Sequence, residues 1–457
     1  MMIDLVEVAM RSRTGAKMPS RDWELGLFRK IEELVKEYNL DFSKADEFLN
    51  TDNSIADAAF SAAVDFIVDK GAYCLSTGRN IRFSEDEVKE AIKAAPSEVV
   101  MGEGKDTRIF KQGKIEGRDP LNICPGHHAP FTEDVGPLVV KNFAQIPRAD
   151  FLEGFNFPEV DGREILGPPL EAYASRKEVG YLRDAIRRAG RPGMAIVYYP
   201  ISTRASSFLS VLHPECGLRK TDGILFTLLP DVKVEYDYLT AAIIYQQNGY
   251  FGINGSFGIV GGFSGGPEGS AIESIARTIV GWMVYRDNIH YPGVEHMLTL
   301  TATKMTFHPI NNARSVVYQA LNRNSNTIYM EWVIPSSELC TEEHLWESAV
   351  RSIEGTINGA NLYAHRVSRP RMNAGQTPLE PEFMIEVSDA TLKAGLKRND
   401  GGELLKRITK GLEGKDSVPG KTIQECYDLV NHKPSSEYEE IYNRVKGKLA
   451  DLGLEFE

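Results

Sequence analysis

The stretch that decides the fold is FGINGSFGIVGGFSGGPEGSAIESIARTIVGWMVY, residues 251–285. It begins with a β-rich run, turns through the glycine-rich GGFSGG, and continues into a long helical pattern. Pro267 suits the first position of that helix, where its missing N–H leaves no hydrogen bond unmade. A strand, a turn and a helix in this order form one βα unit of a parallel sheet covered by helices.

The same alternation extends in both directions along the chain. Intervening helices are indicated by YDYLTAAIIYQQNG, NARSVVYQALNR and EEHLWESAVRSIEGTINGA. Eight strands with helices between them favour a closed (β/α)8 TIM barrel, an α/β fold, over an open doubly wound sheet. In such a barrel the ligands bind at the carboxyl ends of the strands. The β-rich runs, counted along the chain, are residues 121–126, 151–157, 194–200, 223–229, 251–260, 297–303, 327–332 and 360–366.

Helical segments flank the barrel on both sides. We expect residues 1–118 to form an N-terminal helical extension packed on the barrel, residues 119–380 the barrel, and residues 381–457 a C-terminal helical extension. Ser84 and Glu87 predict a capping box, and Gly71 closes the helix before it. Near the C-terminus, Ser436 with Glu439 predicts a second box and Gly453 the end of that helix.

Composition narrows the function classes. The 457 residues carry a net charge of −12, which disfavours binding to nucleic acid or to an anionic membrane surface. No run approaches the roughly 20 apolar residues of a membrane span, and the start has no secretory pattern. Five scattered cysteines suit a reducing compartment rather than a disulfide framework. We therefore expect a cytoplasmic protein.

A long excursion follows the third predicted strand. The segment YPISTRASSFLSVLHPEC, residues 199–216, leaves the carboxyl end of MAIVYYP, where barrel enzymes carry their catalytic loops. Long loops inside compact domains are more often functional than idle. The position predicts that this loop contributes to the active site.

Segments spread over the whole chain resemble one family. They are RTGAKMPSRDWEL, YCLSTGRNIRFSEDEVKEAI, AGRPGM, GGFSGG, GKTIQECYDL and LADLGL, and their order and spacing resemble the archaeal monomethylamine:corrinoid protein methyltransferases. The resemblance implies a (β/α)8 barrel in a homo-oligomer that transfers a methyl group from an amine to Co(I) of a cognate corrinoid protein. It also implies no tightly bound cofactor, because the partner protein supplies the corrinoid (cobalamin).

The sequence departs from this family in the loop. The family carries a pyrrolysine there, at a position that falls within residues 206–209, and this loop has neither pyrrolysine nor lysine. Ser207 and Phe208 are therefore candidate substrate contacts that cannot form the imine adduct of the family. By analogy with pyrrolysine-free relatives of the trimethylamine enzymes, we expect a quaternary or otherwise non-monomethylamine donor.

Candidate catalytic residues come from two segments. In TIYMEW, strand alternation puts Thr327, Tyr329 and Glu331 on one face, which would offer a hydroxyl, a phenol and a carboxylate to a cation at the mouth. Tyr329 resembles a family active-site tyrosine, and Thr327 stands where the family has glutamine. Glu268 resembles a family glutamate at the active site, and a carboxylate there could bind an ammonium or accept its proton. The alternatives are an ordinary packing layer of the barrel for the first three, and a charge that complements the helix dipole for Glu268.

Aromatic residues at strand ends could enclose a methylated ammonium by cation–π attraction, although core packing would also account for most of them. The candidates for this cage are Tyr198, Tyr199, Phe226, Phe257 and Tyr329.

Two further readings stay open. Cys124, His127 and His128 in CPGHHAPFTED could hold a zinc ion, which would make the protein a zinc-dependent corrinoid methyltransferase, but no second ligand pair completes the set. The loss of pyrrolysine also fits a catalytically decayed homologue that binds an amine or the corrinoid protein. The sequence leaves the methyl donor, the loop residue that replaces pyrrolysine and the oligomer number open.

Overall fold

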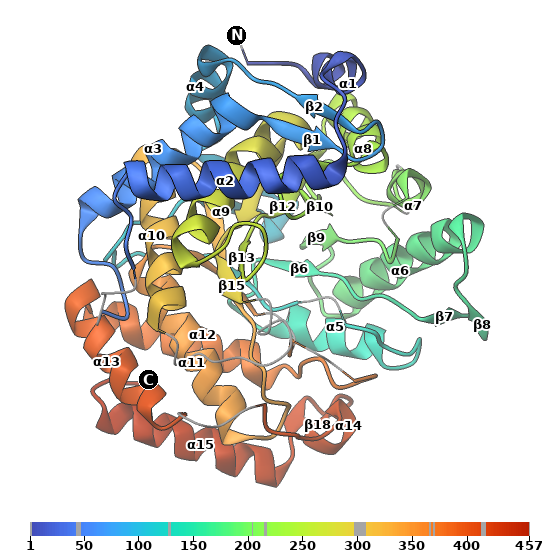
Figure 1. The fold of residues 1–457 in the computed structure, drawn as a ribbon. Coiled ribbons are helices and arrows are strands. Elements are labelled where there is room, and N and C mark those ends of the chain that lie inside the picture. Colours follow the sequence, from blue (N-terminus) through green and yellow to red (C-terminus); the bar gives the residue numbers. More distant parts are fainter. Residues whose placement is uncertain are drawn as a thin grey trace.

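The computed structural model describes residues 2–42, 47–126, 129–202, 204–213, 217–296, 308–364, 367–368, 371–412 and 417–456. Within them a parallel eight-stranded sheet forms the centre of the molecule (Figure 1). Its hydrogen-bonded order is β5-β17-β16-β14-β12-β10-β9-β6. From β6 to β17, each barrel strand therefore pairs with the barrel strand that follows it along the chain. The strands are β5 (Ile123–Cys124), β6 (Phe151–Glu153), β9 (Ala195–Tyr198), β10 (Gly223–Phe226), β12 (Phe251–Gly255), β14 (Asp287–Tyr291), β16 (Ile328–Val333) and β17 (Asn361–Ala364).

The two strands at the ends of this order, β5 and β6, lie close together. The backbone N–H of Asp150, directly before β6, donates to the carbonyl of Ile123 in β5 over 2.9 Å. The sheet therefore closes nearly completely, and the prediction of a (β/α)8 barrel is confirmed. Each strand is followed by a helix of the outer layer. These helices are α5 (Gly136–Gln145), α6 (Pro168–Arg188), α7 (Ala205–Ser210), α8 (Tyr236–Gln247), α9 (Pro267–Tyr285), α10 (His308–Asn324), α11 (Glu342–Ile357) and α12 (Leu379–Ala394).

The sixth strand differs from the prediction. The barrel uses β14, with the sequence DNIHY, whereas the prediction placed this strand at residues 297–303, which lie outside the described residues. Asp287 and His290 are buried in β14, so the strand lacks the apolar run by which the others were recognised. Burial disfavours the charged form of both side chains: it raises the pKa of Asp287 well above its usual range and lowers that of His290 to about 3.

The N-terminal part covers one side of the barrel (Figure 1). The indole N–H of Trp23 donates to the carbonyl of Asp231, and this bond fixes α2 against the loop after β10. The capping box of Ser84 and Glu87 and the end at Gly71 are confirmed. The elements of this part are α1 (Leu5–Thr14), α2 (Ser20–Glu37), α3 (Asn53–Lys70), β1 (Ala72–Cys74), β2 (Arg79–Ile81), α4 (Glu85–Ala94), β3 (Glu98–Met101), η1 (Gly104–Asp106) and β4 (Arg108–Lys111).

The hairpin β3–β4, which the sequence did not predict, closes the amino-terminal end of the barrel. Its Val99, Met101 and Phe110 belong to the cluster of side chains inside the barrel, and the Phe110 and Phe151 rings lie 5.0 Å apart. Because this end is filled, a ligand reaches the barrel interior from the carboxyl ends of the strands.

The C-terminal part lies on the opposite side from the N-terminal part (Figure 1) and comprises α13 (Arg398–Lys410), α14 (Ile423–Cys426), β18 (Tyr427–Asp428), β19 (Lys433–Pro434) and α15 (Ser436–Asp451). The cap of α15 is Ser435, whose hydroxyl accepts from the N–H of Tyr438, so the prediction of Ser436 was one residue off. The expected boundary at residue 380 falls inside α12. In the described part of the chain no helix has the length and apolarity to cross a membrane.

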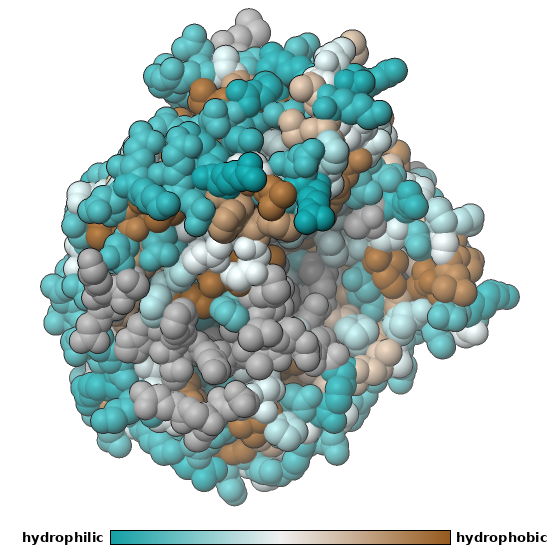
Figure 2. Space-filling model, in the orientation of Figure 1, coloured by the Kyte–Doolittle hydropathy of each residue, from teal (hydrophilic) through white to brown (hydrophobic). Residues whose placement is uncertain are grey.

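Short strands extend the barrel or project from it. Beyond the carboxyl ends of β12 and β14, β13 (Gly258–Val260) pairs in parallel with β15 (Val294–His296). The strand β11 (Lys233–Val234) pairs with β1, and β7 (Glu159–Val160) forms a projecting hairpin with β8 (Arg163–Glu164). The surface is hollowed below α2 in the same view (Figure 2).

Candidate functional site

Partly exposed side chains form a rim at the carboxyl ends of the strands: Tyr199, Thr227, Phe257 and Trp332. Tyr199 and Trp332 pack against the cluster inside the barrel, and the Phe257 and Trp332 rings lie 4.9 Å apart. A Cβ added at Gly255 would lie 3.8 Å from the Trp332 ring and 3.9 Å from the Thr227 hydroxyl, so the end of β12 passes close to both side chains. We call this set of four residues the mouth rim.

Beneath the rim lies a buried floor. The Tyr291 and Tyr363 rings stack at 4.9 Å with an interplanar angle of 15°, and the Trp332 ring lies 5.5 Å from Tyr291 and 6.2 Å from Tyr363. Glu153, the last residue of β6, is buried beside them. The structure therefore combines aromatic faces with one carboxyl group at the open end of the barrel.

The electrostatics of the floor follow from burial. Burial, with the nearby Glu153 as the next cause, raises the pKa of Tyr291 and of Tyr363 well above that of an ordinary phenol. Both hydroxyls are therefore neutral at physiological pH and can donate hydrogen bonds. The Tyr291 hydroxyl has no hydrogen-bond partner among the described residues.

The arrangement suits a small organic cation. An ammonium over an aromatic face gains about 0.5–2 kcal/mol, with the larger values where water is excluded. The rim offers two adjoining faces, on Phe257 and Trp332. Tyr199 adds a third aromatic ring, whose hydroxyl lies 3.4 Å from that of Tyr238 on α8. A methylated ammonium needs contacts of this kind because it has few or no N–H groups to donate.

The predicted face of β16 is the wrong one. Ile328 and Met330 point into the barrel with Trp332, so the alternate residues point outward. The Tyr329 hydroxyl donates to the Asn358 carbonyl, 2.9 Å away, and its ring stacks on Tyr318 of α10. The structure therefore places Tyr329 in the packing between the barrel and its helices.

The two other candidates from this segment also lie away from the mouth. Glu331 is fully buried, 2.5 Å from the Arg351 guanidinium of α11. Thr327 precedes β16 at the amino-terminal end of the barrel, where its hydroxyl accepts from Ser325 over 3.0 Å. The chain uses Glu331 as an internal ion-pair partner and Thr327 as part of a turn.

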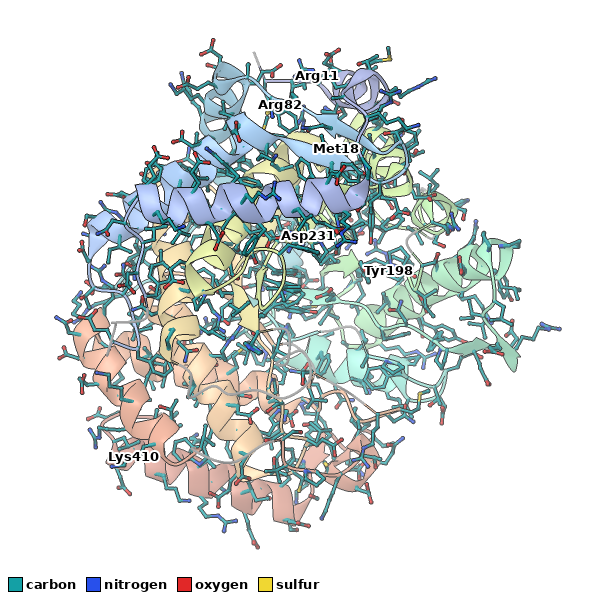
Figure 3. The ribbon with its side chains drawn as sticks, in the orientation of Figure 1. Arg11, Met18, Arg82, Tyr198, Asp231 and Lys410 are labelled. Carbon is teal, nitrogen blue, oxygen red and sulfur yellow. The ribbon has the colours of Figure 1, made fainter. Side chains whose placement is uncertain are left out.

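Glu268 lies in the first turn of α9, where its carboxylate accepts a hydrogen bond of 2.8 Å from the Phe42 backbone. The contact joins α9 to the N-terminal part, outside the mouth rim. Tyr198, labelled in Figure 3, packs with the side chains between the barrel and its helices, and its hydroxyl donates to Glu178 on α6.

The described part of the long loop forms helix α7. Phe208 is buried and stacks on Phe226 at 5.3 Å, in an aromatic cluster with Tyr238 outside the barrel. Ser207 is buried one residue earlier in the same helix. The structure therefore turns Phe208 and Phe226 away from the mouth. Of the predicted cage residues, Tyr199 and Phe257 lie at the carboxyl ends of the strands.

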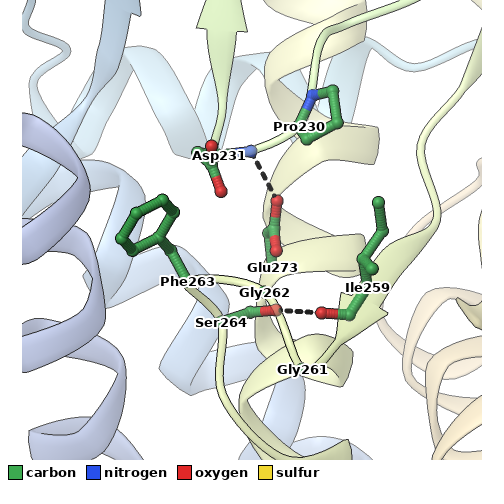
Figure 4. A pocket seen from close by; sticks show the side chains of 8 residues that line it. All are labelled: Pro230, Asp231, Ile259, Gly261, Gly262, Phe263, Ser264 and Glu273. Atoms are coloured by element: carbon green, nitrogen blue, oxygen red, sulfur yellow. Dashed lines mark hydrogen bonds between the residues drawn. The ribbon is translucent and has the colours of Figure 1, made fainter. Parts of the chain in front are cut away.

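A cavity of about 420 Å³ lies outside the barrel, between the loop after β10 and the glycine-rich turn (Figure 4). Two acidic side chains, Asp231 and Glu273, line it, and both have partners. Asp231 pairs with Lys233 at 2.9 Å, and Glu273 accepts from the Asp231 backbone N–H at 2.8 Å.

The zinc hypothesis gains no support from the described residues. Cys124 is buried in the barrel interior, and burial raises the pKa of its thiol well above the usual range. His127 and His128 lie outside the described residues. No group of three or more His, Cys, Asp or Glu in the described ranges could hold a metal ion.

Sequence reasoning missed most of the mouth: Glu153, Thr227, Tyr291, Trp332 and Tyr363. Glu153 carried a usable signal, because it is a charged residue at the carboxyl end of a strand that is otherwise apolar. Trp332 required the correct face of β16, and Tyr291 required recognition of the sixth strand. Neither could be read from the hydrophobic pattern.

Comparison with known proteins gives one family. The family model described as "Monomethylamine methyltransferase MtmB" matches residues 3–454. The chain is 28% identical over 455 residues to monomethylamine methyltransferase MtmB2 of Methanosarcina acetivorans, covering 98% of this chain and 97% of that protein, and 29% identical, with the same coverage, to MtmB3 of Methanosarcina barkeri.

Solved structures agree. The structure of Methanosarcina barkeri MtmB superposes with a TM-score of 0.92 at 26% identity, over 100% of this chain and 99% of that one. The structure of a hydroxylamine MtmB complex gives a TM-score of 0.93 with the same identity and coverage.

Proposed function

Because this chain belongs to the monomethylamine methyltransferase MtmB family, we propose that it transfers a methyl group from a methylated amine to Co(I) of a cognate corrinoid protein. The single observation that carries this proposal is the mouth rim over its buried floor. Aromatic faces on Tyr199, Phe257 and Trp332 suit a methylated ammonium, and Glu153 lies beneath them.

The proposed transfer needs little covalent chemistry from the protein. The methyl carbon forms a bond to cobalt with the two electrons of Co(I), the C–N bond breaks, and the amine leaves as a neutral molecule with the electron pair of that bond. The task of the chain is to hold the donor so that its methyl carbon faces the open mouth, and to exclude water behind it. The rim residues hold the cation, and the stacked floor closes the inner side.

We propose a donor other than monomethylamine. The loop of residues 200–216 holds no lysine and no electrophilic side chain, and Phe208 of its helix α7 stacks on Phe226 outside the barrel. A quaternary ammonium already carries the positive charge that makes the amine a good leaving group. No adduct with the protein is needed for such a donor, so the chain acts without pyrrolysine.

The corrinoid is the methyl acceptor and arrives with its own protein. The rim residues are partly exposed, which leaves the mouth accessible to a partner at the carboxyl ends of the strands. A homo-oligomer and a cytoplasmic location remain predictions.

The test is an optical assay of methyl transfer. Co(I) cobalamin, as a surrogate acceptor, is mixed with the protein and with tetramethylammonium, monomethylamine or methanol in turn. We expect methylcobalamin to form with tetramethylammonium and not with monomethylamine. Formation with monomethylamine would overturn the proposed donor. If no donor gave methylcobalamin while a control methyltransferase was active, the proposed methyl transfer would be wrong. Binding of a donor without transfer would then favour an amine-binding homologue.

A further inference from the structure

A buried arginine fixes the backbone behind the mouth rim. Arg277 of α9 is 1% exposed, and its guanidinium donates to three backbone carbonyls: Phe257, Leu228 and, at 3.3 Å, Gly255. These carbonyls lie at or just beyond the carboxyl ends of β10 and β12. At such ends the parallel ladder stops, and a buried carbonyl needs another partner. One side chain thus joins the ends of two neighbouring strands.

The same guanidinium touches the wall of the proposed site. Its central carbon lies 5.7 Å from the centre of the Phe257 ring, which in turn contacts Trp332. Arg277 therefore holds Phe257 both by its carbonyl and by its ring. A shift of the strand end would move this ring relative to Trp332.

The charge of Arg277 has a local counterpart. Glu273, one turn earlier on α9, is buried too, and its charge opposes the lowering of the pKa of Arg277 that burial causes. Glu273 itself accepts a hydrogen bond from the Asp231 backbone N–H at the cavity that both residues line (Figure 4). Because the negative charge of Glu273 offsets the positive charge of Arg277, the guanidinium can lie near the mouth without strongly repelling a cationic ligand.

We propose that Arg277 is a positioning residue that sets the place of Phe257 in the cation site. The inference rests on the proposed function, and it names a residue that acts through another rather than one that touches the donor. Lysine at this position would keep the charge beside Glu273, but its single ammonium lacks the planar fork that reaches three carbonyls.

The structure offers a matched control at the other end of the barrel. Arg191, before β9, also pairs with a carboxylate, Asp106 at 3.1 Å, and donates to three carbonyls, those of Ala144, Ile146 and Ala149. Arg191→Lys should lose a similar number of hydrogen bonds without touching the mouth. A general loss of stability would affect both variants, whereas a positioning role would separate them.

The first measurement is the binding of tetramethylammonium by calorimetry. We expect Arg277→Lys to weaken binding at least about threefold, on the scale of one cation–π contact, and Arg191→Lys to leave it unchanged. In a Phe257→Leu background, Arg277→Lys should have less than about a twofold effect, because residues that act through one contact are not additive. Equal weakening in both backgrounds, or by Arg191→Lys, would overturn the inference.

The second measurement does not need a ligand. Amide hydrogen exchange over residues 226–260 should be faster in Arg277→Lys than in wild type, and unchanged there in Arg191→Lys. If the wild type binds no methylated ammonium, the proposed function fails, and this measurement still decides whether Arg277 fixes the strand ends. Unchanged exchange over residues 226–260 in Arg277→Lys would overturn the role of Arg277.

Discussion

At the scale of single residues, Trp332 is the centre of the proposed cation site. Its ring contacts Phe257, Tyr291 and Tyr363 at centroid distances of 4.9 to 6.2 Å. We predict that Trp332→Leu weakens the binding of tetramethylammonium by about 2- to 30-fold, the range of one cation–π contact. Trp346→Leu on α11, a partly buried tryptophan outside the barrel, is the control. Equal binding by wild type and Trp332→Leu would contradict the site.

Glu178 gives a prediction on pH and stability. Burial raises its pKa from 4.5 to about 7, although hydrogen bonds from Tyr198, Phe157 and Asn156 oppose the rise. A raised folded-state pKa contributes stability that is complete below the unfolded pKa and is lost as the pH rises through 7. Glu178→Gln lacks this dependence, so its free energy of unfolding relative to wild type should rise by about 2.5 kcal/mol between pH 5 and pH 8.

Chemical denaturation at several pH values measures this effect, with the exposed Glu440→Gln as the control. Curves of stability against pH that run parallel for wild type and Glu178→Gln would show that the carboxyl of Glu178 titrates normally.

The candidate site shows where sequence reasoning ends at this scale. Tyr199 and Phe257 could be named in advance because they follow apolar strands directly. Tyr329 and Glu331 were assigned to the wrong face because both faces of β16 are buried, so alternation gives two sets but does not say which set points inward. The inner face became clear only from the packing of Ile328 and Met330 against the other strands.

At the scale of elements, α11 is tied to the barrel by a buried ion pair. Arg351 is 2.5 Å from Glu331 and 2.8 Å from Glu295, and it donates to the Trp332 carbonyl at 2.6 Å. We predict that Arg351→Met lowers the free energy of unfolding by about 3–5 kcal/mol, because the buried Glu331 loses the cation it pairs with and Glu295 keeps only Arg314, at 3.4 Å.

The control is Arg323→Met, which removes an ion pair of similar length between Arg323 and Asp57, at 2.7 Å. Both of its side chains are about a third or more exposed, so the loss should stay below about 1 kcal/mol. Similar losses in the two variants, measured by denaturant titration, would contradict the account of α11.

Helix boundaries were easier to predict than strands. Ser84 with Glu87 and Pro267 mark helix starts by local chemistry that tertiary contacts did not alter. The strand β14 was not predicted, because its buried Asp287 and His290 interrupt the apolar pattern. Burial of such groups is a property of the whole barrel, and no local window contains it.

At the scale of the whole molecule, the two ends of the barrel have different roles. The hairpin β3–β4 fills the amino-terminal end with Val99, Met101 and Phe110, whereas the carboxyl-terminal end carries the partly exposed mouth rim. The alternation of strands and helices was enough to predict the barrel and its ligand-binding end. The closure by the hairpin depends on contacts between distant segments, which the sequence pattern does not reveal.

In the proposed function, the methyl donor binds at the mouth as a cation. The most direct test is calorimetric titration with choline and with 3,3-dimethylbutan-1-ol, its neutral analogue of nearly the same shape. We expect choline to bind at least about threefold more tightly, since only the charged compound gains from the aromatic faces of Phe257 and Trp332. Equal affinity for the two compounds, or binding of neither, would contradict it.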